Sequence, residues 1–575
     1  MRFFLFIFIS FIILLGCETT DDKKNNDSIK TANNKQNTQN ITTIDDDRMF
    51  TLVLLAETAY KKNNYKLALK SYLMAVQKTD DLKIISRALS LAIKNKNHQA
   101  QGIITKKWQK IEPNKPQVYF MLFSHYISEE NINLAYQNAL TGIKKSKNKK
   151  NAKKTIGSLL ISNNNKTIKI TVVDKFITKY RKNSTFLYTK AKILFENKEY
   201  LSAHKQINLS LKSNPNHIDS LILKSQILFA LKKTKQALAF AKSSMSKNKN
   251  NVRVILNYAS MQIDAKTHNR NTYKLLDKAF EIAAKHNDDR YLYITAVLLF
   301  EGGFYRQAEH RFKMLIQAEI QTQNCYYYMG KIKKAHTNYN EALKYFSAVS
   351  SGDYNYRAVY EVAHILNLLG EEQAAIDYIL RASTRFDDEK ILIKLDILMA
   401  TFLQQQKKYE EGFIILSNRL KNNPNNERLL LSRSLLADKL DKLDIAEQDL
   451  IKILTADSKN SSALNALAYI LITRFDNRLE EAAVYAKQAF LLEPENPAIV
   501  DTFGWLKYKQ NQLSTALLHL KKAHKLLFDP EISSHLGEVL WELNRKDEAL
   551  KIWQKALAKF PEDEVLLKTY QKYKK

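Results

Sequence analysis

The feature that most constrains the fold of this chain is a repeat of about 34 residues. A small residue recurs at this interval, and Ala296 and Gly330 are 34 positions apart. A second small residue follows twelve positions after the first, as Ala308 follows Ala296. Small residues at two such positions let two helices approach closely, while larger neighbours fill the adjoining space. The spacing therefore predicts a series of helical hairpins.

Composition agrees with an all-α fold. The 575 residues include only 12 Gly and 8 Pro, and a scarcity of helix breakers favours helix. The short alternating segments that a β-sandwich requires do not occur. The chain is too long for one compact core, so an elongated array fits its length. We count about fifteen repeat slots, of which thirteen are readable, while those near 150–182 and 251–287 are degenerate.

The last complete unit shows the pattern most clearly. Its residues at positions eight, twenty, twenty-four, twenty-seven and thirty-two are Gly537, Ala549, Trp553, Ala556 and Pro561. This pattern resembles the tetratricopeptide repeat family and covers nearly all of residues 48–575. The resemblance implies a right-handed α-solenoid of about 13–15 helical hairpins, closed by a polar capping helix at 562–575. Two extra residues near Phe475–Asn477 are expected at a hairpin turn.

The amino terminus predicts export. Arg2 precedes an apolar run of about a dozen residues, an arrangement typical of a secretory signal peptide. A bilayer span would need roughly 20 apolar residues. The run ends at Leu14-Leu15-Gly16-Cys17, which resembles the bacterial lipobox. The resemblance implies cleavage between Gly16 and Cys17, with diacylglycerol and a fatty acid on Cys17; an uncleaved anchor with an incidental Cys is the alternative.

These features give the expected domain organisation. We predict a signal peptide at 1–16, a lipidated tether at 17–47, the repeat array at 48–561 and the capping helix at 562–575. The tether is polar and cannot form a core, and as a random coil it spans roughly 30 Å. Glu18 follows the lipobox, whereas Asp at this place favours inner-membrane retention in lipoproteins of enterobacterial type. By that analogy the chain is expected at the periplasmic face of the outer membrane.

The carboxyl-terminal repeats show a closer resemblance. Residues 462–523 are similar to the terminal repeats of a proteobacterial lipoprotein group with a lipobox, a polar tether and an array of this length. The best-known member binds a periplasmic carboxyl-terminal processing protease and helps it to degrade peptidoglycan hydrolases. The chain departs from the group at Ala468, where Gly is usual, and at Lys507, where an aliphatic residue is usual. The matching residues are Leu467-Ala468-Tyr469, Leu479-Glu480-Glu481-Ala482, Pro494, Asn496-Pro497, Asp501 and Gly504-Trp505.

The family resemblance also implies a binding surface. In this family the concave face is lined by positions two, five, nine and twelve of the first helix of each hairpin. Exposed Tyr and Trp side chains are favoured anchors for protein partners, although some of them can instead pack between neighbouring repeats. The candidate protein-binding residues are Tyr293, Tyr327, Tyr360, Tyr469, Asp501, Trp505, Tyr508 and Trp541.

No motif indicates catalysis or a bound cofactor. A phosphate-binding loop, a GxSxG elbow, an HExxH helix and paired cysteines are all missing from the sequence. The 12 His are scattered without metal-ligand spacing. Two Cys exclude a disulfide framework, and Cys325 is expected to be a packing residue. We expect no catalytic residue, no metal and no cofactor other than the covalent lipid on Cys17.

The net charge of +31 allows two interpretations. It can attract an anionic surface or nucleic acid, or it can follow from AT-rich codons, which favour Lys, Asn and Ile. We favour the codon interpretation and do not expect a nucleic-acid partner. A cluster of lysines lies between Lys144 and Lys154, and we expect it to be a solvated loop.

Three functions remain compatible with the sequence. The first is a non-catalytic scaffold that binds periplasmic proteins, among them a carboxyl-terminal processing protease and cell-wall hydrolases. The second is an assembly lipoprotein of a secretion or pilus machine. The third is a hydrolase or transferase whose site escapes motif analysis. The repeat array and the lack of catalytic motifs favour the scaffold.

Overall fold

The computed structural model describes residues 43–62, 64–181 and 183–574. In these residues every regular element is an α-helix, and none is a strand. The predicted signal peptide, the lipobox with Gly16 and Cys17, and the tether up to residue 42 lie outside the described residues. The first described helix begins at Thr43, inside the range predicted as tether. None of the described helices is long and apolar enough to cross a membrane.

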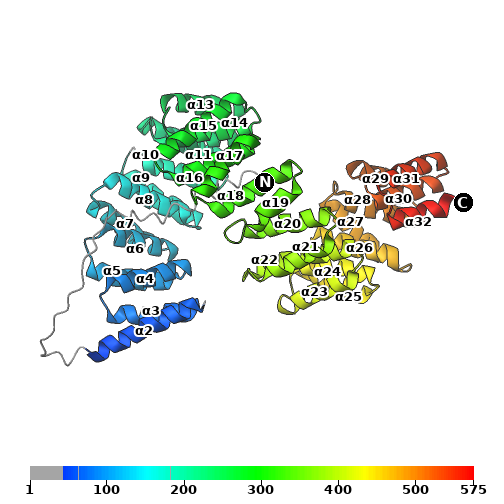
Figure 1. Cartoon of the computed structure of the whole chain (residues 1–575), viewed down its shortest axis with the longest axis horizontal. Coiled ribbons are helices and arrows are strands. Elements are labelled where there is room, and N and C mark those ends of the chain that lie inside the picture. Colours follow the sequence, from blue (N-terminus) through cyan, green and yellow to red (C-terminus); the bar gives the residue numbers. More distant parts are fainter. Residues whose placement is uncertain (1–42, 63, 182, 575) are drawn as a thin grey trace. The chain divides into compact units, whose positions relative to one another are not determined.

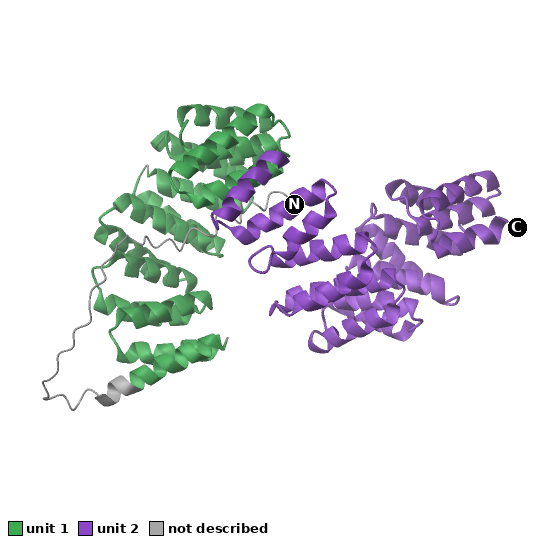
Figure 2. Cartoon of the chain, in the orientation of Figure 1, with its two compact units in different colours: residues 1–304 green, residues 305–575 purple. Residues whose placement is uncertain are grey.

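The chain divides after Phe304 into two compact units, unit 1 and unit 2 (Figure 2). Figure 1 labels their helices. The helices of unit 1 are α2 (Thr43–Lys61), α3 (Tyr65–Lys78), α4 (Leu82–Lys94), α5 (His98–Ile111), α6 (Pro116–Ser128), α7 (Ile132–Lys145), α8 (Lys149–Ser162), α9 (Lys166–Lys179), α10 (Ser184–Glu196), α11 (Tyr200–Ser213), α12 (Ile218–Ala230), α13 (Thr234–Lys247), α14 (Val252–Asp264), α15 (Arg270–Lys285) and α16 (Asp289–Glu301).

Unit 2 contains the remaining helices. They are α17 (Tyr305–Gln317), α18 (Thr322–Ala335), α19 (Tyr339–Ser347), α20 (Asn355–Leu368), α21 (Glu372–Ser383), α22 (Glu389–Gln405), α23 (Tyr409–Asn422), α24 (Glu427–Lys439), α25 (Leu443–Ala456), α26 (Ser461–Arg474), α27 (Leu479–Leu492), α28 (Pro497–Lys509), α29 (Leu513–Leu526), α30 (Pro530–Glu542), α31 (Lys546–Lys559) and α32 (Glu564–Lys574).

Successive helices pack in pairs, and we call the first helix of each hairpin helix A and the second helix B. Unit 1 pairs α2 with α3 and continues to α14 with α15; unit 2 pairs α18 with α19 and continues to α30 with α31. Helices α16 and α17 follow each other across the division and carry the repeat residues Ala296 and Ala308. Helix α32 packs on α30 and α31. The predicted fold class, an all-α array of about 13–15 hairpins, is confirmed.

Turn residues determine where many of the helices end. The A-to-B turns often contain a residue in the left-handed region, such as Lys96 (φ 53°), Lys232 (φ 59°) and Gly303 (φ 73°). This conformation lets the following backbone N–H groups bond back to the last helical carbonyls, as Asn97 N–H does to Ala92 O at 2.9 Å. The Asn97 side chain then accepts from the Ala100 N–H and caps the next helix. Much of the asparagine content therefore has a structural role.

The small residues of the repeat bring paired helices close together. A Cβ atom on Gly537 of α30 would lie 2.1 Å from Nε1 of Trp553 on α31, and Trp553 is fully buried. Gly330 of α18 faces the Phe346 ring of α19 in the same way, at 2.6 Å. Only a residue without a side chain fits such spaces, which explains the choice of glycine.

The two slots that the sequence pattern left unread are regular hairpins. Helices α8 and α9 occupy the first slot, and α14 and α15 occupy the second. Each lacks the usual Ala at the start of helix B, where Lys169 and Thr272 are the buried residues instead. The Lys169 ammonium donates a hydrogen bond to Ile161 O at 3.1 Å, so its charge retains a partner. Burial lowers the pKa of Lys169.

The lysine-rich stretch 144–154 was expected to be a solvated loop, but most of it is helical. Helix α7 continues to Lys145 and α8 begins at Lys149, so only three residues connect them. The Asn148 side chain accepts from the Asn151 N–H and starts α8. Lysine has a high helix propensity and is compatible with both helix ends. The expected irregularity near Phe475–Asn477 is present, because α26 and α27 are joined by the four residues 475–478.

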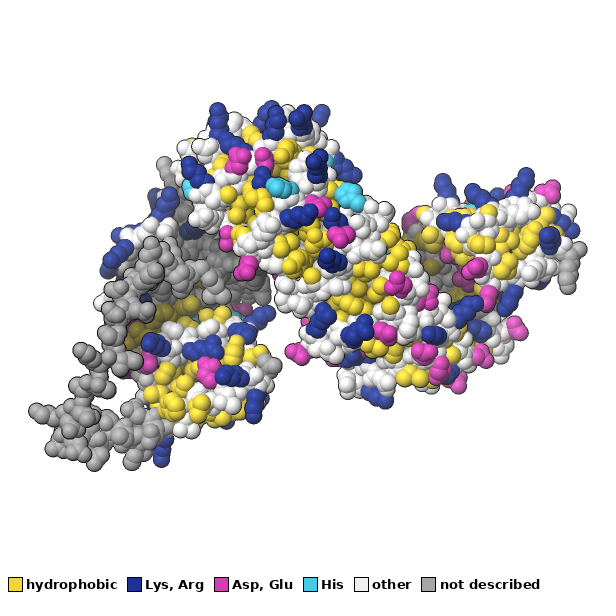
Figure 3. All heavy atoms as spheres, viewed as in Figure 1, with side chains coloured by type: hydrophobic (Ala, Val, Ile, Leu, Met, Phe, Trp, Pro, Cys, Tyr) yellow, Lys and Arg dark blue, Asp and Glu magenta, His cyan; other side chains and the backbone are white. Residues whose placement is uncertain are grey.

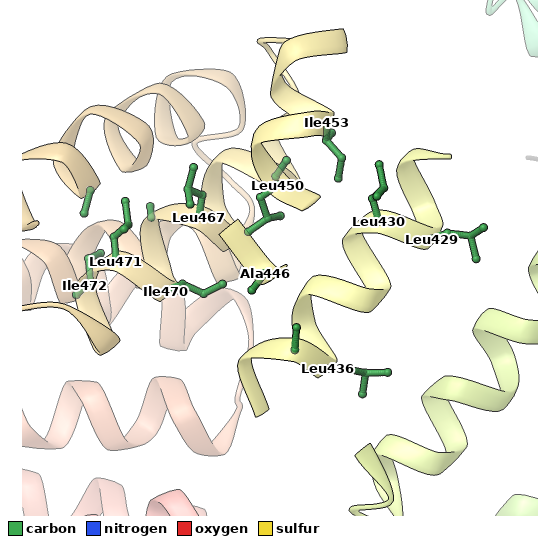
Figure 4. Packing of buried hydrophobic residues seen from close by; sticks show 14 of the residues in the cluster. Leu429, Leu430, Leu436, Ala446, Leu450, Ile453, Leu467, Ile470, Leu471 and Ile472 are labelled. Atoms are coloured by element: carbon green, nitrogen blue, oxygen red, sulfur yellow. The ribbon is translucent and has the colours of Figure 1, made fainter. Parts of the chain in front are cut away.

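The hydrophobic core of this array runs from hairpin to hairpin and has no single centre. Figure 4 shows part of it in unit 2, where Leu430 of α24, Leu450 of α25 and Leu467 of α26 lie in one cluster. All three are at most 2% exposed. Each hairpin therefore covers the apolar face of the next, as expected for a repeat array. This arrangement leaves the outward positions of both helices free to vary.

Candidate protein-binding surface

Three neighbouring A helices near the carboxyl end, α26, α28 and α30, bring together most of the predicted binding residues. Tyr469 lies on α26, Asp501, Trp505 and Tyr508 on α28, and Trp541 on α30. Helix α28 contacts both α26 and α30. The three helices therefore present one shared surface built from the predicted A-helix positions.

A hydrogen bond connects the outer two of these helices. The Tyr469 hydroxyl on α26 donates to the Glu531 carboxylate on α30, two repeats further along the chain. Burial raises the pKa of Tyr469, and the negative charge of Glu531 raises it further. The tyrosine is therefore a neutral donor at physiological pH. Sequence reasoning found Tyr469 but not Glu531, because no local pattern pairs residues 62 positions apart.

A buried acid–imidazole pair lies next to this bond. The Asp501 carboxylate and His535 are joined by a hydrogen bond of 2.9 Å between Oδ2 and Nδ1. The Trp505 ring stacks on His535 with centroids 4.0 Å apart and rings inclined by 16°. Burial disfavours the imidazolium, but Asp501, Glu531 and the more distant Glu538 outweigh burial and raise the pKa of His535.

Two acceptor atoms of this region lack a donor among the described residues. They are Oδ1 of Asp501 and Oδ1 of Asn465, and both are buried. Asn465 lies on α26 and Asp501 occupies the equivalent repeat position on α28. A buried acceptor without a donor costs free energy, on the order of 1–3 kcal/mol.

Some of the candidates take the alternative that the sequence left open and pack between neighbouring repeats. Trp505 is 7% exposed and Tyr327 is 8% exposed, and Asp501 is also buried. Tyr327 stacks on Tyr354 at 4.4 Å between centroids. These residues pack between repeats because the same helix face that lines the surface also contacts the next A helix. Their role in binding stays a prediction.

The other candidates are more accessible. Tyr360 on α20 is 40% exposed, and its ring lies 6.0 Å from that of His364. Tyr293, Tyr469, Tyr508 and Trp541 are half-buried. Tyr508 stacks on Trp505, and Trp541 lies against Trp553 and Tyr573. Tyr360 therefore has the geometry of an exposed anchor, and the rest combine packing with partial exposure.

The structure also shows an apolar feature that sequence analysis missed. Exposed aliphatic side chains recur on the B helices of unit 2, on five successive hairpins. Outward-facing B-helix positions that would usually be polar carry Leu, Ile or Val there, although not at one fixed position of the repeat. The exposed residues are Leu380, Ile414, Ile451, Val484, Leu491 and Leu518.

Within the described residues, no group of three or more His, Cys, Asp or Glu side chains could hold a metal ion. Cys325 is fully buried in α18, and burial raises the pKa of its thiol to about 12. The thiol is therefore unreactive in the folded chain. Packing is the role that this environment supports.

Sequence comparisons identify the repeats. Residues 326–389 match a family model described as tetratricopeptide repeat, and residues 162–244 match one described as anaphase-promoting complex, cyclosome, subunit 3. Residues 326–389 are therefore similar to tetratricopeptide repeats, a class of helical repeat that generally binds proteins.

A curated relative, the TPR repeat-containing protein PA4667 of Pseudomonas aeruginosa, is 30% identical over 210 residues. The match covers 36% of this chain and 35% of the relative, so it spans about a third of each protein.

Solved structures give broad but distant matches. A tetratricopeptide-repeat protein of Parabacteroides merdae is 18% identical, covering 45% of this chain and 97% of that one, with a TM-score of 0.36. A thermophilic tetratricopeptide-repeat protein of Thermus thermophilus is 23% identical, covering 31% and 97%, with a TM-score of 0.29. The APC/C hetero-tetramer Cut9-Hcn1 is 14% identical, covering 86% and 96%, with a TM-score of 0.32.

Proposed function

We propose that this tetratricopeptide-repeat protein is a lipid-anchored scaffold at the periplasmic face of the outer membrane. The sequence supports export and lipidation through the signal peptide and Cys17. In the specific form of the proposal, the array binds a carboxyl-terminal processing protease and its peptidoglycan-hydrolase substrates. Holding enzyme and substrate on one scaffold raises their effective concentration without any catalytic residue.

The observation that carries the proposal is the surface of α26, α28 and α30. It combines the Tyr469–Glu531 bond, the Asp501–His535 pair and two buried acceptors without donors among the described residues. Carboxylates at this surface, such as the half-buried Glu531, suit a basic side chain of a partner, because an Arg or Lys head group supplies several donors and a positive charge. The aromatic rings beside them provide apolar contact area.

Partner binding is tested by measuring the affinity of residues 18–575 for a purified carboxyl-terminal processing protease from the same source. Tyr508→Ala removes a half-buried ring of α28, on the proposed surface, and should weaken binding about tenfold, the effect of losing a moderate anchor. Leu518→Ala is the matched control, because Leu518 is 68% exposed on a B helix. Equal affinities for both variants and the parent chain would contradict the proposed surface.

Membrane attachment is tested separately. Cys17→Ala should abolish incorporation of labelled palmitate, because the thiol and the mature amino group of residue 17 are the acylation sites of the lipobox. The variant should also leave the membrane fraction. Equal labelling of the parent chain and the variant would refute lipidation at Cys17 while leaving the binding surface untouched.

A further inference from the structure

Almost all of the net positive charge of the chain lies in unit 1. Residues 1–304 carry 51 Lys and Arg against 23 Asp and Glu, a net charge of +28. Residues 305–575 carry 39 against 36, a net charge of +3. Codon usage acts on the whole gene and does not explain why the acidic residues are depleted in one half. On the face drawn in Figure 3, acidic side chains mix with basic ones over much of unit 2.

Within unit 1 the charge is concentrated on one edge. We define a B-to-A connection as the segment that begins with the last two residues of a B helix and ends with the first residue of the next A helix. Four successive connections, 144–149, 178–184, 212–218 and 246–252, contain no Asp or Glu. Each carries at least one exposed cation. The exposed cations of this basic rim are Lys144, Lys147, Lys149, Lys179, Arg181, Lys212, Lys247 and Lys249.

The four connections form one continuous edge. Helix α10 contacts α8 and α12, and α12 contacts α14, so the starts of these A helices lie next to each other in order. No described acidic residue forms an ion pair with any of the eight cations of the basic rim. Their charge is therefore available to an external anion.

The rest of the chain provides an internal comparison. All eight B-to-A connections of unit 2, counted in the same way, carry at least one acidic residue, for example Glu319, Asp457 and Asp529. On the opposite edge of unit 1, four A-to-B turns counted in the same way also lack acidic residues, but no more than two of them are consecutive, and turns with Glu129 and Glu130 or with Glu199 interrupt the series. A run of four consecutive connections without an acidic residue is found only at the basic rim.

Helix stability explains only part of this pattern. A cation in the last turn of a helix interacts favourably with the helix dipole, which accounts for Lys144, Lys179, Lys212 and Lys247. It does not account for Lys147, Lys149, Arg181 and Lys249, which lie outside the last turn of a B helix. It also does not require the loss of every acidic residue from four connections in a row.

We propose that the basic rim binds the anionic phospholipid headgroups of the membrane to which the chain is anchored. This inference rests on the proposed lipidation, because the tether from Cys17 leads directly into unit 1. A random coil of that length spans roughly 30 Å, which keeps unit 1 within reach of the headgroups. Lipid chains already provide stable attachment. The rim adds orientation, by holding one edge of unit 1 against the lipid surface.

The composition of the rim favours a lipid surface over nucleic acid. Seven of its eight exposed cations are Lys, whose compact charge suits diffuse phosphates better than bidentate recognition of bases. Single-stranded nucleic acid is typically bound by exposed aromatic rings that stack on bases. The aromatic residue of these connections, Tyr180, is half-buried and covered by the Lys153 ammonium at 4.3 Å.

The test measures binding of the unacylated mature chain, residues 18–575, to phosphatidylethanolamine vesicles with and without phosphatidylglycerol. This chain retains every described helix. We expect binding only when phosphatidylglycerol is present, and a steep loss of affinity as salt is raised, because the Debye length falls. Lys147→Gln, Lys149→Gln, Lys247→Gln and Lys249→Gln together should lower the affinity about 100-fold or more, since each basic residue near an anionic membrane contributes about fivefold.

The matched control changes the same amount of charge on the other edge of unit 1. Lys61→Gln, Lys62→Gln, Lys233→Gln and Lys235→Gln together should change the affinity by about threefold or less, because these charges lie at the A-to-B turns. Circular dichroism verifies the fold of both variants. Equal losses in the two variants, no binding to phosphatidylglycerol, or tighter binding to duplex DNA than to vesicles would each overturn the proposal. All three outcomes are independent of whether Cys17 is acylated.

Discussion

Gly537→Ala should destabilise the last hairpin, although the same change usually stabilises a helix. The added Cβ would lie 2.1 Å from Nε1 and 2.2 Å from Cε2 of Trp553. The indole is fully buried, and the rings of Tyr573 and Trp541 lie within 6.0 Å of it. A rigid ring that is enclosed in this way cannot move aside, so α30 and α31 must separate.

The magnitude follows from two opposing effects. Overpacking of a well-packed core costs about 1–3 kcal/mol, and an overlap with a rigid ring belongs at the upper end. Replacing Gly by Ala within a helix gains about 1 kcal/mol. We therefore expect a net loss of about 2 kcal/mol in the free energy of unfolding of the carboxyl-terminal repeats.

Denaturant unfolding followed by tryptophan fluorescence reports on this region. Three of the four Trp residues, Trp505, Trp541 and Trp553, lie on α28, α30 and α31. Gly412→Ala is the matched control, because its nearest neighbour is the flexible Cδ1 of Leu436 at 3.0 Å. The helix gain should offset that small cost, so the control should lie within about 1 kcal/mol of the parent chain.

A double substitution separates overlap from other causes. If the overlap with the indole causes the loss, Gly537→Ala should cost much less in a Trp553→Leu background, and the two changes should show a clear interaction energy. A Gly537→Ala chain as stable as the parent, or additive effects of the two substitutions, would show that the close approach of α30 and α31 is not what selects glycine.

Two further predictions concern the surface of α26, α28 and α30. The pKa of His535 is raised in the folded chain, so the stabilisation from its imidazolium is complete below the unfolded-state pKa of about 6.5 and is lost as pH rises through the folded-state value. The denaturation midpoint should therefore decrease as the pH rises above about 6.5. Asp501→Asn should flatten that dependence, and an unchanged pH profile would contradict the pair. Trp505→Ala should lower the free energy of unfolding by about 3–5 kcal/mol, because the ring is only 7% exposed. A variant that lost partner affinity but kept its stability would show instead that Trp505 is an exposed anchor.

The repeat pattern was sufficient to predict the fold because its small residues have a steric cause. Gly330 and Gly537 each face a large ring, so their spacing records the distance between paired helices. The same logic explains the two unread slots. At the start of α9 and α15, Lys169 and Thr272 replace the small residue, and each satisfies its polar group locally. A pattern based on size alone cannot recognise such substitutions.

The binding surface could be predicted only in outline. The register placed Tyr469, Asp501 and Trp505 on neighbouring A helices, which the structure shows. It could not give their exposure, because a position that lines the surface also contacts the next A helix. The partners Glu531 and His535 lie 62 and 34 residues from Tyr469 and Asp501, respectively. Contacts at such separations depend on the twist between repeats, and local sequence patterns do not contain that information.

The distribution of charge shows a different limit of sequence reasoning. A net charge of +31 taken over the whole chain is compatible with codon bias. When the net charge is counted separately for residues 1–304 and 305–575, the values are +28 and +3. Codon bias does not account for this difference between the two units. Helix boundaries then place the excess on one edge of unit 1. The net charge therefore points to a binding surface only when it is counted separately for each structural unit.

The two units therefore have different surface chemistry within one repeat architecture. Unit 1 carries the basic rim, which suits the anionic surface proposed above. Unit 2 is nearly neutral and carries the Tyr469–Glu531 and Asp501–His535 contacts, which suit a folded partner with basic side chains. Because most contacts in a repeat array are between hairpins close in the chain, substitutions in the basic rim should not disturb the surface of α26, α28 and α30. Vesicle binding and protease binding should consequently respond to separate sets of substitutions, and a rim variant that also lost protease affinity would contradict this division.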